Sequence, residues 1–235
     1  MAMDVIPAID VEKGRSRVVY WPGASAGIGA PTDRPERIAE QFVAQGARIL
    51  HLVDFDGAKR QSPADLETVG AVAGRVAVPL QVAGGLEEAD HVRLAFAAGA
   101  TRAVVSVAML ERPEVLRACL DVAGDWLAVG LDPRPERIAA FPWRRPVVPT
   151  LASLVEELVA SGVSRLVLSH GGHTPDAALL ESLVRRHDAD ILVAGGATDL
   201  DGVRRLRDAG IAGVILGEAL LSGAIDFPRA LEAAA

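Results

Sequence analysis

One short sequence occurs twice in this chain at a fixed distance, and this repeat constrains the fold more than any other feature. The run Val-Ala-Gly-Gly ends at Gly85 and again at Gly196, so the difference between the two positions is 111 residues. Four pairs of residues share this offset: Gly84 and Gly195, Gly85 and Gly196, Gly99 and Gly210, and Ala108 and Ala219. The repeat predicts that the chain consists of two copies of one half.

Short apolar runs alternate with helical patterns along the whole chain. Strands are expected at residues 5–10, 48–57, 78–82, 102–107, 126–131, 165–169, 190–194 and 213–216, with one more short strand at 17–21 inside a long loop. Helices are expected at about 35–46, 63–73, 87–98, 113–122, 150–161, 175–187, 198–209 and 226–234. Alternation of this kind indicates a parallel sheet with right-handed crossovers.

Eight such units in 235 residues match a (β/α)8 barrel, a fold that typically needs about 250 residues. We predict one domain over residues 1–235, built from half-barrels of about 1–122 and 123–235. An open doubly wound sheet is the alternative. The closed barrel is favoured because a ring accommodates a twofold repeat naturally.

Charge and composition narrow the class of protein. The formal net charge is −7 and no basic cluster stands out, which argues against nucleic acid as a partner. No apolar stretch reaches the roughly 18 residues that a membrane-spanning helix needs. Cys119 is the only cysteine, so an internal disulfide is excluded and a reducing compartment is expected. We therefore expect a soluble cytoplasmic protein.

Two carboxylates stand at strand ends, where barrels of this class carry their chemistry. Asp10 ends the first expected strand and Asp132 the fifth, and these strands lie opposite each other in an eight-stranded ring. Two carboxyl groups facing one mouth can serve as acid and base if their surroundings separate their pKa values. The structural alternative is that each Asp caps a helix or pairs with a basic residue.

The repeated glycines predict two sites for phosphate. We call the expected phosphate site at Gly84, Gly85 and Ser106 the first cradle. The expected site at Gly195, Gly196 and Gly217 is the second cradle. Glycine at the end of a strand before a helix lets backbone N–H groups point at an anion. The alternative is that each Gly-Gly forms a tight turn. Two phosphates at opposite ends of a long substrate would hold its middle over the Asp pair.

Other candidate residues follow the later strands. His51 lies within a strand and is expected to be a core residue. His170, His173 and Asp176 lie in a run without helical His-x-x-x-His spacing, so no metal site is predicted. Trp143 follows the fifth strand. It is either a packed aromatic residue or a lid that stacks on a flat heterocycle.

Several of these motifs resemble one enzyme family. They are Pro7-Ala8-Ile9-Asp10, the run from His51 to Ala58, the two Ala-Gly-Gly sequences, Val129 to Asp132, and Gly217 to Leu220. The family is the phosphoribosylformimino-aminoimidazole carboxamide ribotide isomerases of histidine biosynthesis. The resemblance implies a duplicated half-barrel, two phosphate sites and a cofactor-free Amadori rearrangement of an aminoaldose to an aminoketose. It also implies a bis-phosphorylated ribotide as substrate, and we expect a monomer.

The resemblance further implies roles for single residues. Asp10 would be the general base and Asp132 the general acid, Trp143 would cover the base of the substrate, and Ser169 would keep a hydroxyl at the end of the sixth strand. The chain departs from the family pattern at three places. Ser169-His170 replaces Thr-Asp before a shorter loop, Ser106-Val107 replaces Gly-Thr, and Leu86-Glu87 stands where an arginine is usual. These departures bear on substrate identity rather than on the fold.

Three other functions are compatible with the same motifs. The first is a dual-substrate isomerase that also converts phosphoribosyl anthranilate in tryptophan synthesis. The second is the related cyclase, although that enzyme usually carries Cys at the position of Ala8. The third is a barrel that binds a phosphate ligand without catalysis, and the presence of both Asp10 and Asp132 counts against it.

Overall fold

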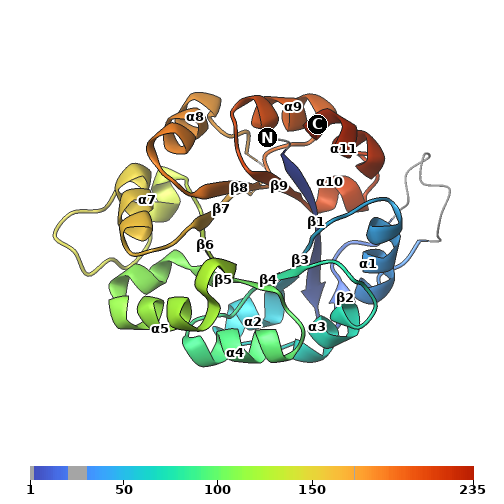
Figure 1. Ribbon diagram of the computed structural model, residues 1–235, viewed down its shortest axis with the longest axis horizontal. Coiled ribbons are helices and arrows are strands. Elements are labelled where there is room, and N and C mark those ends of the chain that lie inside the picture. The colour runs from blue at the N-terminus through green and yellow to red at the C-terminus, as the bar shows by residue number, and fades with distance from the viewer. Residues whose placement is uncertain (1–2, 21–30, 172) are drawn as a thin grey trace.

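The computed structural model describes residues 3–20, 31–171 and 173–235 and shows a closed barrel of eight parallel strands (Figure 1). The strands are β1 (Asp4–Glu12), β3 (Leu50–Asp54), β4 (Leu80–Ala83), β5 (Arg102–Ser106), β6 (Leu127–Leu131), β7 (Arg165–Ser169), β8 (Asp190–Ala194) and β9 (Gly213–Leu216). Pairing of β1 with β9, from Asp4 against Gly213 onward, closes the ring. The predicted (β/α)8 barrel is confirmed.

Helices form the outer layer and cover the strands on all sides (Figure 1). They are α1 (Pro35–Ala44), α3 (Leu66–Ala73), α4 (Ala89–Ala97), α5 (Pro113–Ala123), α7 (Leu151–Ala160), α8 (Ala177–Arg186), α9 (Leu200–Asp208) and α11 (Phe227–Ala234). Their starts follow local chemistry. Proline stands in the first turn of α1, α5 and α11, and the side chains of Asp65, Thr150, Asp176, Asp199 and Asp226 accept N-terminal N–H groups.

Short elements that the sequence did not predict follow the carboxyl ends of the strands. They are β2 (Arg15–Ser16), α2 (Phe55–Arg60), a 3-10 turn at Val107–Glu111, α6 (Pro135–Ala139) and α10 (Glu218–Leu221). One more 3-10 turn, Gly124–Trp126, precedes β6. In place of the strand predicted at 17–21, Tyr20 forms a single bridge with Thr32, and position 21 lies outside the described residues. The added elements build the rim around the mouth of the barrel.

Side chains alternate along each strand between two apolar layers. One set packs under the helices in the larger core, and the other fills the barrel, including Ile6, Ala8, Val104 and Ala128. His51 is a buried interior residue, as predicted, and its Nδ1 lies 2.8 Å from Nε2 of Gln81. Burial lowers the pKa of His51 to about 4, so this ring is neutral at physiological pH.

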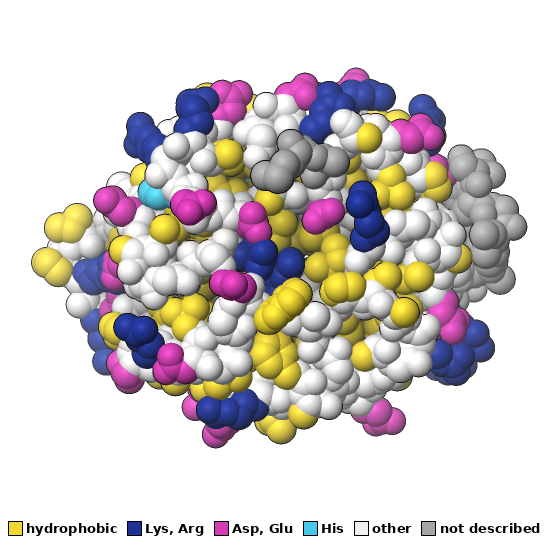
Figure 2. Space-filling model, in the orientation of Figure 1, with side chains coloured by type: hydrophobic (Ala, Val, Ile, Leu, Met, Phe, Trp, Pro, Cys, Tyr) yellow, Lys and Arg dark blue, Asp and Glu magenta, His cyan; other side chains and the backbone are white. Residues whose placement is uncertain are grey.

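Charged residues gather where the strands begin, at the end opposite the mouth. Arg102, the first residue of β5, donates to Oε1 of Gln81 at 2.9 Å, and Arg165 of β7 pairs with Asp190 of β8 at 2.5 Å. Burial lowers the pKa of Arg102 to about 10. Figure 2 shows basic side chains at the centre of the visible face with acidic side chains around them. The interior is thus ionic at one end and apolar in the middle.

Candidate active site

The mouth of the barrel brings the two candidate carboxylates to opposite sides of one ring. Asp10 lies in β1 and Asp132 directly follows β6, and four strand-to-strand steps separate these strands in either direction around the barrel. On β1 the side chains of Ile6 and Ala8 fill the barrel, so the period of two directs Asp10 into the mouth as well. The sequence placed these residues correctly in the topology.

Asp10 is a half-buried carboxyl group. Burial raises its pKa above the ordinary value, the nearby guanidinium of Arg17 opposes this shift, and the carboxylate of Glu218 adds to it. Arg17 is anchored at this place because its backbone N–H donates to the carbonyl oxygen of Asp10 at 2.8 Å, and its guanidinium lies 4.1 Å from the centre of the Phe55 ring. Asp10 therefore holds a proton more readily than a carboxyl group in water.

Asp132 has the opposite environment. Nε of Arg134 donates to its Oδ1 at 2.8 Å, a terminal nitrogen of the same guanidinium contacts Oδ2, and Nε of Arg137 lies 3.4 Å from Oδ2. The hydrogen bonds from Arg134 lower the pKa of Asp132 below the ordinary value. The two carboxyls thus differ in protonation tendency, as an acid–base pair requires.

Trp143 lies beside Asp132 in a cavity of about 310 Å³. Its Nε1 donates to the carbonyl oxygen of Ile138 at 2.7 Å, and its ring centre lies 4.8 Å from that of Phe141. The guanidinium of Arg145 lies over the tryptophan ring, 5.6 Å from its centre. The largely apolar lining and the adjacent carboxylate suit a flat heterocycle with a reacting atom near Asp132.

The first cradle opens into a second cavity of about 280 Å³ in the mouth. Gly84, Gly85 and Ser106 line it, together with Ser169 from the end of β7 and the unpredicted Glu87. The hydroxyl of Ser106 accepts the N–H of Ala108 at 3.2 Å. The structure therefore brings four of the predicted site residues together and adds a carboxylate to them.

The second cradle lies across the ring at the ends of β8 and β9. The N–H of Gly195 donates to the carbonyl oxygen of Ile215 at 3.0 Å, which continues the β-ladder past the strand. A Cβ atom added at Gly217 would make ordinary van der Waals contact with the Ala8 side chain at 3.7 Å, so this position is not tightly packed. The cradle consists mainly of backbone.

Glycine is required in both cradles by close packing against the preceding loop. A Cβ atom on Gly84 would lie 2.1 Å from the carbonyl oxygen of Asp54, and one on Gly196 would lie 2.7 Å from the ring of Pro175. Both glycines also have positive φ angles, 103° and 79°. The tight-turn interpretation therefore describes the backbone of both cradles.

Two further residues of the mouth have roles that sequence reasoning missed. The buried carboxylate of Asp54 accepts three backbone N–H groups, from Gly57 and Ala64 at 2.7 Å and from Asp65 at 2.9 Å, and so fixes the loop after β3. Arg134 stands two residues after Asp132, and this spacing was the only indication in the sequence that a cation would clamp that carboxylate.

The loop after β7 places His170 close to Asp132 and Arg134. The ring of His170 is only 8% exposed, and its Nε2 has no hydrogen-bond partner among the described residues. Burial lowers its pKa. In the described part of the chain no three His, Cys, Asp or Glu side chains are grouped as metal ligands.

Comparison with known proteins shows the family of this chain. A family model described as "Histidine biosynthesis protein" matches residues 4–226. The chain belongs to this family. A Roseiflexus relative (strain RS-1) is 34% identical over 98% of this chain and 99% of its own length, and one from Chloroflexus aggregans is 34% identical over 97% of both chains. A relative from Moorella thermoacetica is 32% identical over 99% of both.

The three relatives carry one name, an imidazole-4-carboxamide isomerase whose substrate name contains two 5-phosphoribosyl groups. The match to these relatives covers nearly the whole of each chain, and the expected family resemblance is confirmed. No helix among the described residues is both long and apolar enough to cross a membrane.

Proposed function

We propose that the chain catalyses the isomerisation for which its relatives are named, the Amadori rearrangement of an aminoaldose ribotide to the aminoketose. The carrying observation is that Asp10, within β1, and Asp132, directly after β6, lie on opposite strands of one mouth in environments that shift their pKa values in opposite directions. Such a pair can give and take protons in one catalytic cycle.

The reaction needs two proton transfers and no redox partner. One carboxylic acid protonates the ribose ring oxygen, the C–O bond breaks, and an iminium forms. A carboxylate then removes the C2 proton, and the resulting enolamine tautomerises to the ketose. Each proton transfer contributes on the order of 10²–10⁴-fold. Binding of the substrate at both ends supplies orientation.

The free chain sets the starting states of the pair. Arg134 keeps Asp132 ionised, whereas burial favours a proton on Asp10. The family resemblance assigns the acid role to Asp132, and that order requires Arg134 to release Asp132 when substrate binds. An anionic group of the substrate would attract Arg134 away from Asp132.

Substrate recognition follows from the two cavities and the second cradle. The cavity beside Trp143 suits the heterocycle, and the backbone at the second cradle, which is not tightly packed at Gly217, suits a phosphate oxygen. We place the ribose that reacts between Asp10 and Asp132. We further propose one domain of two half-barrels, 1–122 and 123–235, acting as a cytoplasmic monomer without a cofactor.

The deciding experiment is turnover of the purified chain with the bis-phosphorylated ribotide and, separately, with phosphoribosyl anthranilate. Conversion of the first substrate, with loss in Asp10→Asn and Asp132→Asn but not in the surface variant Glu67→Gln, supports the proposal. Full activity in either Asn variant would remove that residue from the catalytic pair.

A further inference from the structure

We propose that Glu87 makes the first cradle a poor phosphate site, so that the chain recognises its substrate mainly through one phosphate at the second cradle. The inference rests on the proposed function and adds the class of substrate. An aminoaldose ribotide that carries a phosphate at one end only should be accepted.

The first observation is the charge of the cavity. The side chain of Glu87 is 22% exposed and lines the 280 Å³ cavity beside Gly84 and Gly85. No Lys or Arg is among the described residues that line this cavity. A phosphate there would meet a carboxylate in a partly desolvated space, where like charges repel strongly. Burial already raises the pKa of Glu87, so the cavity disfavours negative charge before any ligand enters.

Arg112 compensates this charge only in part. One terminal nitrogen of its guanidinium donates to the backbone carbonyl oxygen of Glu87 at 3.1 Å, and the same nitrogen lies 3.7 Å from the Glu87 carboxylate. A distance of 3.7 Å is longer than a hydrogen bond. The carboxylate of this cavity-lining residue therefore keeps unused acceptor capacity.

The second observation is that backbone donors of the first cradle already have partners. The N–H of Glu87 donates to Nδ1 of His91 at 3.2 Å, and the N–H of Ala108 donates to the Ser106 hydroxyl at 3.2 Å. A phosphate oxygen would have to displace these acceptors before it could use the donors. The net gain from each new hydrogen bond is then small.

The matched positions of the second cradle lack all three features. With the offset of 111 residues, Glu87 corresponds to Thr198, His91 to Gly202 and Ser106 to Gly217. Thr198 is exposed and uncharged, and neither glycine carries a side chain that could accept an N–H. Among the described residues no acceptor pairs with the N–H of Ala219, the counterpart of Ala108. The two cradles share a backbone conformation and differ in the side chains at matching positions.

The chemistry of Glu87 also indicates what the first cradle accepts. A carboxylate takes hydrogen bonds from hydroxyl or amine groups, and the Ser106 hydroxyl can add one more polar contact. The unphosphorylated end of a ribose offers such hydroxyl groups. We therefore place a neutral, hydrogen-bond-donating group at this end of the substrate.

Soaking crystals with inorganic phosphate tests this without reliance on activity. In the unmodified chain, phosphate should fill the second cradle at a concentration at least 10-fold below that needed for the first. Glu87→Gln should bring the two concentrations within about threefold. Equal filling of both cradles in the unmodified chain, or a first cradle that stays empty in Glu87→Gln, would overturn the inference.

Kinetics with three ribotides tests the substrate class. The bis-phosphorylated compound is compared with the two forms that each lack one phosphate. We expect one of these forms to keep kcat/KM within about 10-fold of the parent and the other to lose at least 100-fold. Loss of 100-fold with both would show that each cradle holds a phosphate firmly, and would overturn the inference while leaving the proposed function intact. Absence of turnover with all three ribotides would instead contradict the proposed function. The soaking experiment would still test whether Glu87 weakens phosphate binding at the first cradle.

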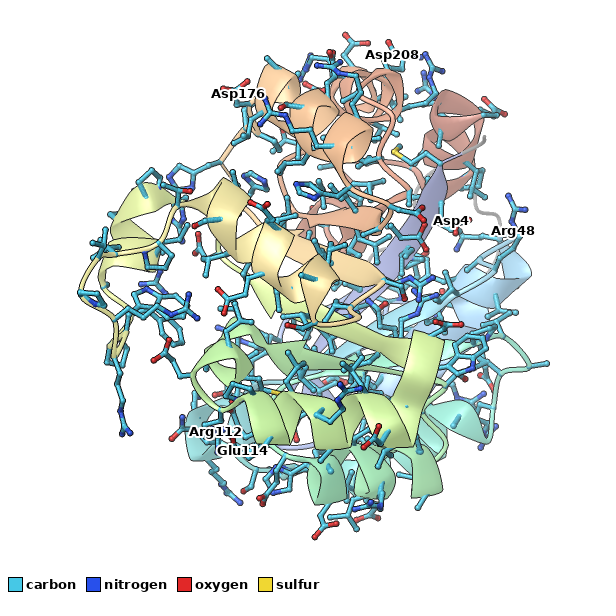
Figure 3. All side chains as sticks on the ribbon, turned by 60° about the vertical axis from the view of Figure 1, so that its left-hand side comes forward. Asp4, Arg48, Arg112, Glu114, Asp176 and Asp208 are labelled. Carbon is cyan, nitrogen blue, oxygen red and sulfur yellow. The ribbon has the colours of Figure 1, made fainter. Side chains whose placement is uncertain are left out.

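Glu114→Gln is the matched control. Glu114 lies with Arg112 at the start of α5 (Figure 3), is exposed, and does not line the mouth cavity. The Glu114→Gln variant removes the same charge as Glu87→Gln, at the neighbouring edge of the barrel. It should change neither the phosphate concentrations nor the ratio between the ribotides, and an equal effect of both variants would reduce the inference to a nonspecific effect of net charge.

Discussion

The two half-barrels use the same backbone for different purposes. Each ends a strand in Gly-Gly with positive φ angles, 103° and 74° at Gly84 and Gly85 and 74° and 79° at Gly195 and Gly196. Around this shared turn, the first half adds the carboxylate of Glu87 and two acceptors for backbone N–H groups, whereas the matching positions of the second half carry neither a carboxylate nor such an acceptor. Duplication thus preserved the geometry of the strand ends and left the side chains free to diverge.

The largest expected effect concerns the pair of carboxyl groups, Asp10 from the first half and Asp132 from the second. Asp10→Asn and Asp132→Asn keep the shape of each side chain and remove its proton chemistry. Each should lower kcat by at least about 10²-fold with KM nearly unchanged, because the groups that hold the substrate remain. Steady-state kinetics on both variants and on the double variant measures this. A double variant no slower than either single one would show that the two residues act as a unit, and additive losses would show independent roles.

The next largest effect compares how tightly the two Gly-Gly turns are packed. Gly84→Ala places a Cβ atom on backbone atoms of Asp54 and should lower the free energy of unfolding by about 3–5 kcal/mol. Gly196→Ala meets the edge of the Pro175 ring, which can shift, and should cost about 1–3 kcal/mol. Urea unfolding compares them. A larger cost at Gly196 would contradict the closer backbone approach that the first half shows.

Arg134→Gln should produce a pH shift. Arg134 lowers the pKa of Asp132, so the carboxylate of the unmodified chain persists to lower pH. Without the guanidinium the pKa returns towards its ordinary value. Because Asp132 is the acid in the proposed order, its pKa sets the alkaline limb of the kcat/KM profile, and this limb should move to higher pH. Arg137→Gln, which removes a cation at 3.4 Å from the same carboxylate, should move the limb less. A shift of the acid limb to higher pH in Arg134→Gln would instead mean that Asp132 works as the base.

The smallest expected effect comes from placing a carboxylate in the second half at the position that matches Glu87 in the first. Thr198→Glu puts a carboxylate at the position that matches Glu87, but on an exposed residue where water screens charge. We expect the affinity of the second cradle for inorganic phosphate to fall several-fold, measured by calorimetry in low salt. Thr198→Gln is the uncharged control. The same loss in both variants would assign the effect to side-chain size.

The sequence predicted the barrel because its evidence is periodic and repeated. Strands such as Arg165–Ser169 and Asp190–Ala194 are apolar on both faces, and the offset between Gly84 and Gly195 relates one half to the other. It also placed Asp10 and Asp132 on opposite strands. Those features depend on order along the chain, which a sequence states directly.

The rim of the mouth could not be predicted in the same way. Helices α2, α6 and α10 have only 6, 5 and 4 residues, too few for a helical period to show. The three N–H groups that Asp54 accepts come from residues up to 11 positions away. The bond between His91 and Glu87 and the clamp of Arg134 on Asp132 join residues only four and two positions apart, but they depend on a local loop conformation that no periodic pattern marks. The chemistry of the site therefore lies largely in contacts that local sequence patterns do not encode.

Closure of the ring by β1 and β9 has a consequence for synthesis of the chain. Asp4–Glu12 leaves the ribosome near the beginning, and its partner Gly213–Leu216 emerges only when most other strands already exist. Until then one edge of β1 is an open row of N–H and C=O groups, of the kind that pairs with strands of other chains. The unpaired edge of β1 therefore stays exposed during most of chain elongation. Pairing with β9, the last strand to be synthesised, removes this risk of aggregation.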